Sequence, residues 1–461
     1  MNRTLAVLGI VGLVLAGVAG VWRLDQGRQY LQLVAAGERA LDAGNSYAAI
    51  EAFSGAVALR PNSMVAYLRR GEAYHAQRRD DEAIRDLREA MRRAPDATQP
   101  VVALGDLFDA GNDPARAADM YAQAVARLQD QDPQLLYKLA LARYRAGTPA
   151  AAIDPLRRAI ARNDSNGEAH YLLGLVYRDT QDVDRAISSL ERAVKVAPSL
   201  IPAHEELADL YRSAGRAVDE MRQLQTLATL DDHVERSVAI GLAEARRAQY
   251  DGALGTLSGA GTRAPTNPQV QLAIARVYLA RAERTRDREA AARALKVLEH
   301  ALGGTARRSE GLALFGRAMY LSGDYAGSER ILREAIATSP VDLEAFAYLA
   351  DSAEHAQHFE DARDALLSLD VLQGDTVTGD ARTTRTERIG VLSFKAGDSK
   401  SAVLYLGRAA GAGRADAGSW AMLAQARWQT GDLDGARDAL ARGLALDGRH
   451  PDLLRLRRTI R

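Results

Sequence analysis

The chain has 461 residues, and its 60 Lys and Arg side chains balance its 60 Asp and Glu side chains, so the formal net charge is zero. This balance argues against a strongly basic surface, and we expect no nucleic-acid partner. The sequence contains no cysteine, which excludes disulfides, thiolate metal sites and cysteine nucleophiles.

The first predicted element is a membrane-spanning helix at the N-terminus. Residues 4–22 carry no charged side chain, and Arg3 and Arg23 flank them. A helix that crosses a bilayer needs about 20 apolar residues, more than the apolar core of a signal peptide usually has. We therefore expect residues 1–23 to form an uncleaved, single-pass anchor. A cleaved signal sequence is the alternative, because small residues precede Gly20.

Three small residues of this segment recur at intervals of four, namely Gly12, Ala16 and Gly20. They share one helix face, and this spacing lets two membrane helices approach closely, so the span offers a route to a homodimer. Basic residues on both sides of the span leave its orientation open. The very short N-terminus favours an inner-membrane anchor, with the rest of the chain in the periplasm or otherwise outside the cytoplasm.

From residue 30 onwards, the sequence repeats with a period of 34 residues. When the positions of a repeat are numbered 1 to 34, position 8 is Gly or Ala, and positions 20 and 24 are mostly Ala and Leu. Twelve successive repeats keep this pattern, and a period of this length indicates a repeat architecture. The repeats begin at residues 30, 64, 98, 133, 167, 201, 234, 268, 309, 343, 383 and 417.

Each repeat contains the pattern of two amphipathic helices. Apolar residues at positions 4, 7 and 11, and again at 20, 21, 24 and 27–28, share one helix face. Gly at position 15 of six repeats supplies the turn between the helices. Proline avoids the helix interiors except at Pro155, where we expect a kink. One helix pair cannot bury its own apolar face, so the repeats are predicted to stack into an all-α solenoid without strands.

The pattern resembles the tetratricopeptide repeat family, and residues 167–200 match it best. This repeat carries the family's characteristic residues at His170, Leu173, Gly174, Tyr177, Ala186, Leu190, Ala193 and Pro198. The resemblance implies a right-handed α-solenoid superhelix of about twelve tandem helix-turn-helix repeats, in which the first helix of each repeat lines a concave groove. In the family, positions 2, 5, 6, 9, 12 and 13 of the first helix face this groove.

Departures from the period divide the chain. The repeat at 268–308 holds seven extra residues, nearly two helical turns, which a lengthened helix can absorb without losing its apolar face. Residues 371–386 contain few apolar side chains, which is typical of a flexible loop. The predicted segments are an anchor at 1–23, a linker at 24–29, repeats 1 to 10 at 30–370, a flexible loop at 371–386, repeats 11 and 12 at 387–450, and a basic capping helix at 451–461.

No arrangement of catalytic residues is apparent, so we predict that the chain is not an enzyme and has no cofactor. His170 and His204 occupy a packing position in adjacent repeats and are expected to be structural. His355 and His358 are three residues apart and could hold a metal from one helix face. Nothing in the sequence completes such a site, and no metal is predicted.

The groove positions of the first three repeats carry five acids and one base. An acidic lining of this kind would favour a basic or neutral partner, and a solvated polar face is the alternative. The acids are Glu38, Asp42, Glu72, Asp106 and Asp109, and the base is Arg69.

The groove positions of repeats 4 and 5 are different, because they carry Tyr and Leu. We interpret them as a peptide-binding surface in which Tyr137 and Tyr171 are neighbours, and the alternative is that these rings pack onto adjacent helices. Position 9 of the first five repeats holds no Asn, so the resemblance does not extend to the subclass that grips a partner's C-terminal carboxylate. The residues of this surface are Tyr137, Leu141, Tyr144, Tyr171 and Leu175, with Lys138 and Arg178 beside them.

The sequence as a whole resembles a membrane-anchored bacterial scaffold that binds a partner protein or peptide in its concave groove. The resemblance implies a role in cell-envelope assembly or export. The alternative function is that of a regulatory or substrate-docking subunit of a separately encoded envelope enzyme.

Overall fold

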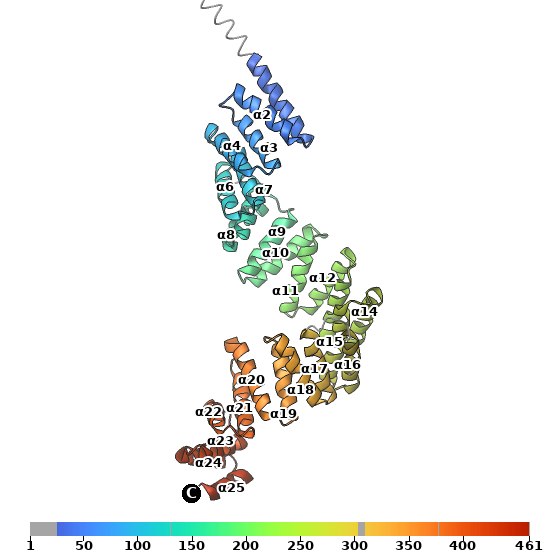
Figure 1. The fold of residues 1–461 in the computed structure, drawn as a ribbon, viewed down its shortest axis with the longest axis vertical. Helices are drawn as coiled ribbons and strands as arrows, with labels where there is room; N and C mark the ends of the chain where they lie inside the picture. The colour runs from blue at the N-terminus through green and yellow to red at the C-terminus, as the bar shows by residue number, and fades with distance from the viewer. Residues whose placement is uncertain (1–24, 130, 303–308, 377, 461) are drawn as a thin grey trace, which may run out of the picture. The chain divides into compact units, whose positions relative to one another are not determined.

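The computed structural model describes residues 25–129, 131–302, 309–376 and 378–460. These residues form helices joined by short turns, and no strand occurs among them, which confirms the predicted all-α solenoid (Figure 1). The predicted anchor at 1–23, with Gly12, Ala16 and Gly20, lies outside the described residues. Within the described ranges, no helix combines the length and the apolar character that a bilayer crossing requires.

The helices belong to two compact bodies, which divide between Leu230 and Asp231. The sequence predicted repeats 1 to 10 over residues 30–370, and its 34-residue period continues across this division. The described part of the N-terminal body contains a helix at residues 25–42 and then α2 (Ser46–Leu59), α3 (Met64–Ala76), α4 (Asp80–Arg93), α5 (Gln99–Ala110), α6 (Pro114–Arg127), α7 (Pro133–Arg145), α8 (Pro149–Arg162), α9 (Gly167–Asp179), α10 (Val183–Val196), α11 (Ile201–Ser213) and α12 (Ala217–Leu230).

The C-terminal body continues the pattern of paired helices. Its described elements are α13 (Val234–Arg246), α14 (Tyr250–Arg263), α15 (Pro268–Thr285), α16 (Arg288–Leu302), α17 (Ser309–Ser322), α18 (Tyr325–Thr338), α19 (Leu343–His355), α20 (Phe359–Gln373), a 3₁₀ turn (Gly374–Thr376), α21 (Asp380–Lys395), α22 (Ser399–Gly411), α23 (Ala417–Gln429), α24 (Leu433–Leu446) and α25 (Pro451–Thr459).

The small residues at position 8 allow the two helices of a repeat to approach closely. A methyl group on Gly174 of α9 would lie 2.5 Å from Cγ of Leu190 on α10, and one on Gly316 of α17 would lie 2.5 Å from Cγ of Leu332 on α18. Leu190 and Leu332, at position 24, are fully buried. The first helices of neighbouring repeats also touch, as in α7 with α9 and in α13, α15, α17 and α19 in succession. This packing places the first helices along one face of each body.

The turn between the two helices of a repeat has a left-handed residue at position 15. Gly44 has a φ of 71° and Gly215 a φ of 70°, and Ala248 adopts the same conformation with a φ of 60°. Glycine reaches this region without strain, whereas a side chain makes it costly. The sequence prediction of a glycine turn is therefore confirmed, and the turn persists in repeats that lack the glycine.

Two predicted segments differ from the structure, and the predicted lengthening of a helix is confirmed. The expected linker at 24–29 is helical from residue 25. The expected loop at 371–386 is much shorter, since α21 already begins at Asp380. Pro155 is accommodated within α8, which is helical from end to end. The seven extra residues lengthen the helices as predicted, because α15 has 18 residues where α13 has 13.

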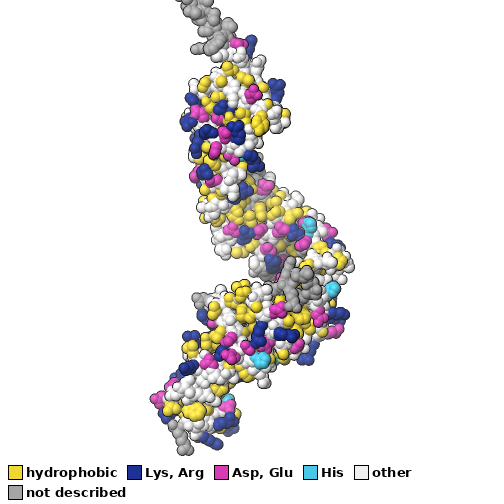
Figure 2. All heavy atoms as spheres, in the orientation of Figure 1, with side chains coloured by type: hydrophobic (Ala, Val, Ile, Leu, Met, Phe, Trp, Pro, Cys, Tyr) yellow, Lys and Arg dark blue, Asp and Glu magenta, His cyan; other side chains and the backbone are white. Residues whose placement is uncertain are grey.

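The face of the molecule drawn in Figure 2 carries mixed side chains. Figure 2 shows basic and acidic side chains interspersed over both bodies, in keeping with the zero net charge, while hydrophobic side chains gather over the region of α9 and α10. At the C-terminal end, α25 packs Leu453 and Leu456 against α23 and α24 and covers their apolar surface.

Candidate partner-binding site

The predicted peptide-binding surface coincides in part with a pocket of about 490 Å³ in the N-terminal body. The pocket lies beside α5, α6 and α7 and reaches the start of α9. Five of the residues predicted from the sequence line it together, namely Tyr137, Lys138, Leu141, Asp106 and Asp109. The remaining lining residues are Ala110, Tyr121, Gln134, Asn166 and Glu168.

Helix α7 presents these side chains because its opposite stripe is buried. Asp132 caps the helix by accepting hydrogen bonds from the backbone N–H groups of Gln134 and Leu135, at 2.8 and 3.2 Å. The buried stripe consists of Leu135, Leu136, Leu139, Ala140 and Ala142. Helical periodicity then turns Tyr137, Lys138 and Leu141 to the other side, where they line the pocket.

The tyrosine rings of this surface are neither fully exposed nor fully buried. Tyr137, Leu141, Tyr144 and Tyr171 are half-buried against the apolar core of α8 to α11. Burial raises the pKa of Tyr137, and the charges of Glu168 and of the Tyr171 hydroxyl raise it further. Among the described residues, neither the Tyr137 nor the Tyr171 hydroxyl has a hydrogen-bond partner. The rings therefore pack in part onto adjacent helices and remain in part accessible to a ligand.

Two members of the predicted surface are engaged within the chain instead. The Tyr144 hydroxyl donates to Oδ2 of Asp179 at 2.7 Å, and burial together with this hydrogen bond raises the pKa of Tyr144 to about 12. Arg178 pairs with Asp179 at 2.9 Å and with Glu206 on α11. These contacts tie α7, α9 and α11 together. Leu175 is half-buried on α9.

The acidic lining predicted for the first three repeats is largely neutralised. Lys138 Nζ lies 2.7 Å from Oδ1 of Asp106, which also accepts a 2.6 Å hydrogen bond from the Tyr121 hydroxyl. Arg145 pairs with Asp109 at 3.0 Å. The next repeat supplies both bases, so these two predicted groove acids are paired within the chain. Arg145 sits at groove position 13 and could have been found by applying the same positions to its repeat.

The charges of the first two repeats are paired in the same way. Arg69 lies 2.8 Å from Glu72 and 3.6 Å from Glu38. The hydrogen bond to Glu72 raises the pKa of Arg69, and the charges of Glu72, Glu38 and Asp42 raise it further. Asp42 is exposed. One arginine thus serves three predicted groove acids.

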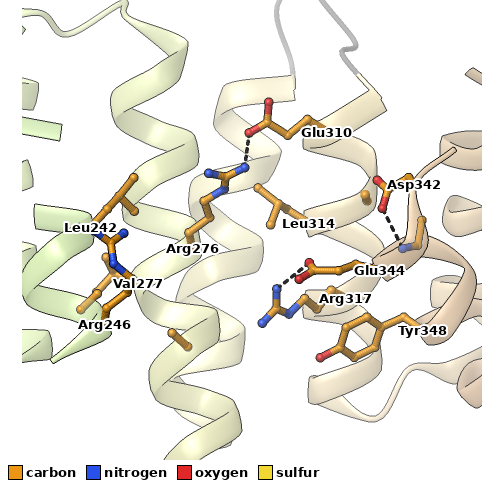
Figure 3. Close-up of a pocket in the computed structure, with 14 residues that line it drawn as sticks. Leu242, Arg246, Arg276, Val277, Glu310, Leu314, Arg317, Asp342, Glu344 and Tyr348 are labelled. Carbon is orange, nitrogen blue, oxygen red and sulfur yellow. Dashed lines mark hydrogen bonds and ion pairs between the residues drawn. The ribbon is translucent and has the colours of Figure 1, made fainter. Parts of the chain in front are cut away.

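A second pocket, of about 520 Å³, lies in the C-terminal body along α13, α15, α17 and α19 (Figure 3). It is lined by Arg246, Arg276, Arg317 and Tyr348, among others, and Figure 3 shows these side chains converging from successive first helices. This pocket lies outside the predicted binding residues, which occupy groove positions of repeats 1 to 5 only. Positions 6, 9 and 13 of repeats 7 to 10 identify the same four residues.

The lengthened helix α15 contributes to this second pocket. Its added turn carries Glu283, which accepts two hydrogen bonds of 2.6 Å from Arg317 and one from the Tyr348 hydroxyl. Arg317 also lies 3.2 Å from Glu344, and Arg276 pairs with Glu310 at 2.6 Å (Figure 3). The pocket therefore combines acids and bases that already satisfy one another.

The four histidines considered in the sequence are held by local contacts. His170 and His204 are buried, as predicted, and His204 lies between the Gln223 side chain and the Pro198 carbonyl, at 2.7 and 2.9 Å. His355 stacks on Tyr325 with ring centroids 4.4 Å apart. His355 and His358 do not share a site, because His358 instead lies 2.8 Å from Glu329.

Glu329, His358 and Asp361 bring their ligand atoms within 4.8 Å of one another, a spacing that could suit a metal ion. Arg333, however, pairs with Glu329 and lies 2.7 Å from Asp361, so a guanidinium already neutralises both carboxylates. Glu329 is 2 % exposed and occupies position 21, which is apolar in most repeats. The cluster is an ion-pair network in which exposed side chains satisfy one buried acid, Glu329.

The comparisons with known proteins concern the repeats. The model of the tetratricopeptide repeat family matches residues 34–98, 102–168, 137–201, 171–233, 314–372 and 388–451. No curated protein matches the chain significantly.

Similar solved structures include MamA, which is 25% identical over 35% of this chain and 94% of its own, with a TM-score of 0.34. The pilF protein of Pseudomonas aeruginosa is 18% identical over 46% of this chain and 96% of its own, with a TM-score of 0.36. Naa15/Naa10 bound to HypK-THB is 14% identical, covering 95% of this chain and 96% of that chain, with a TM-score of 0.36.

Proposed function

Since the chain belongs to the tetratricopeptide repeat family, whose solenoids are scaffolds suited to protein–protein interaction, we propose that it binds a partner protein or peptide along its first helices. The observation that carries this proposal is the pocket beside α7. There, Tyr137 and Leu141 remain half-exposed, and the Tyr137 hydroxyl has no hydrogen-bond partner in the described part of the chain. Aromatic side chains of this kind are frequent anchors of protein interfaces.

The proposal includes a place for the scaffold. The uncharged residues 4–22 support an N-terminal anchor in the inner membrane, with the repeats outside the cytoplasm and a role in envelope assembly or export. Gly12, Ala16 and Gly20 would allow two such anchors to pair. In this proposal the chain holds its partner near the bilayer and catalyses no reaction of its own.

Crosslinking from intact membranes tests the binding function. A photoreactive amino acid at Gln134, which lies on the pocket rim and is exposed, would capture the partner for identification by mass spectrometry. The double variant Tyr137→Ala, Tyr171→Ala should weaken binding at least about 30-fold, because truncating an anchor residue costs about 2 kcal/mol or more.

The control has to separate binding from stability, because both rings also pack against the core. Tyr137→Phe with Tyr171→Phe keeps the rings and should leave the melting temperature unchanged while removing two hydrogen-bond donors. Tyr47→Ala, on the exposed face of α2, is the matched surface control, since Tyr47 is 79 % exposed. Unchanged partner capture by a folded Tyr137→Ala, Tyr171→Ala variant would refute the use of this pocket.

A further inference from the structure

The charged groups of the N-terminal pocket are unequally available to a partner. Asp106 is held by Lys138 and Tyr121, and Asp109 is held by Arg145. Glu168 is exposed, and within the described ranges no hydrogen bond or ion pair reaches its carboxylate. The pocket therefore offers one carboxylate that has no partner, whereas its basic side chains are already paired.

Glu168 lies close to the half-exposed Tyr137. Both residues line the same pocket, and after burial the charge of Glu168 is the largest cause of the raised pKa of Tyr137. Glu168 is the second residue of α9, after the N-cap Asn166, and an acid in the first turn of a helix is favoured there by about 0.3–1 kcal/mol. This local effect explains why an acid is tolerated at that position, and it does not supply the carboxylate with a partner.

These groups together fit a basic side chain. A Lys or Arg has only donors at its end, which match the Glu168 carboxylate and the acceptor side of the Tyr137 hydroxyl. Its aliphatic stem can cover Leu141, and its cation can approach the face of the Tyr137 ring. An acidic segment would instead meet Glu168, and it could gain Lys138 or Arg145 only by displacing Asp106 or Asp109.

We infer that the pocket beside α5, α7 and α9 recognises a partner segment in which a Lys or Arg lies next to an apolar side chain. The inference rests on the proposed function, since it names the chemistry of the partner for the same site. It reverses the charge preference of a groove that grips a carboxylate, because the available charge here is that of Glu168.

A peptide selection followed by charge variants tests this inference. The full chain, reconstituted in lipid nanodiscs, is used to select binders from a random peptide phage library, and the selected peptides are measured by fluorescence polarisation. We expect them to be enriched in Lys or Arg beside apolar residues. Glu168→Gln should weaken them at least tenfold, Glu168→Lys should weaken them further, and Tyr137→Ala should weaken them as well.

Glu235→Gln is the matched control, because Glu235 is also an exposed acid at the second position of a first helix, α13. It should leave the affinity unchanged, and both Gln variants should melt within a few degrees of the original chain. Selected peptides that are acidic or neutral, or whose affinity is unchanged by Glu168→Lys, would overturn the inference. If such peptides still compete with the crosslinked partner for binding, the proposed scaffold function is retained. A selection without binders, together with membranes that yield no crosslinked partner, would refute both.

Discussion

Replacing Gly316 by Ala measures how much the close approach within one repeat matters. Alanine is the better helix former by about 1 kcal/mol, so propensity alone would make the variant more stable. The new methyl group, however, would lie 2.5 Å from Cγ and 2.7 Å from Cδ2 of the buried Leu332. Overpacking a core costs about 1–3 kcal/mol, and a contact of 2.5 Å belongs in the upper half of that range, so a net loss of about 1–2 kcal/mol remains after the propensity gain.

The assay is urea unfolding followed by circular dichroism at the helical band. Gly255→Ala in α14 is the matched control in the same body, because no atom lies within 4 Å of the added methyl group, and it should gain up to about 1 kcal/mol. In a double-mutant cycle, Gly316→Ala should cost much less once Leu332→Ala has removed its neighbour. A Gly316→Ala protein as stable as the original, or an additive cycle, would refute the packing argument.

Three further predictions concern single contacts. Arg70→Met should cost about 2–3 kcal/mol in urea unfolding, because it leaves the buried Asp86, which is 8 % exposed, without the guanidinium that binds it at 2.6 and 2.9 Å. The double variant Arg70→Met, Asp86→Leu should recover most of this loss. Burial and the hydrogen bond to Asp179 raise the pKa of Tyr144 from 10.0 to about 12, so its stabilising effect is complete below pH 10 and is lost as the pH rises through 12. Tyr144→Phe should reduce the tyrosinate absorbance change in that range by the share of one tyrosine. Ala248→Gly should stabilise the chain by about 0.5–1 kcal/mol in a thermal melt, because its φ of 60° strains an alanine, and an unchanged or lower midpoint would contradict this.

The repeat itself could be predicted because its determinants are local. Positions 8 and 24 face each other across one helix pair, and the clash that a methyl group on Gly174 would make with Leu190 explains why the first of them stays small. The same holds for the left-handed residue at position 15, which recurs at Ala248 without a glycine. These rules act within about 20 residues, so a sequence period exposes them.

The helix that begins at Asp380 could not be predicted from apolar residues, because its first turns have few of them. Thr383 and Thr384 satisfy carbonyls four residues earlier, and the Arg385 guanidinium bonds Asp370 and Gln373 of α20. Such polar contacts leave no apolar period. The pairing of the groove charges could not be predicted for a related reason, since the partner of Asp106 is Lys138, 32 residues away in the next repeat.

The two pockets show how repeats of one design acquire different recognition properties. In the C-terminal pocket, the added turn of α15 brings Glu283 to Arg317 and Tyr348, so an insertion in the sequence supplies the hydrogen-bond partner of a cation and a hydroxyl that line the pocket. In the N-terminal pocket, no insertion supplies a partner to Glu168, and its charge stays available. Because an ion pair that is already satisfied gains little from a ligand, the unpaired carboxylate of the N-terminal pocket is the group that can discriminate between partners of opposite charge.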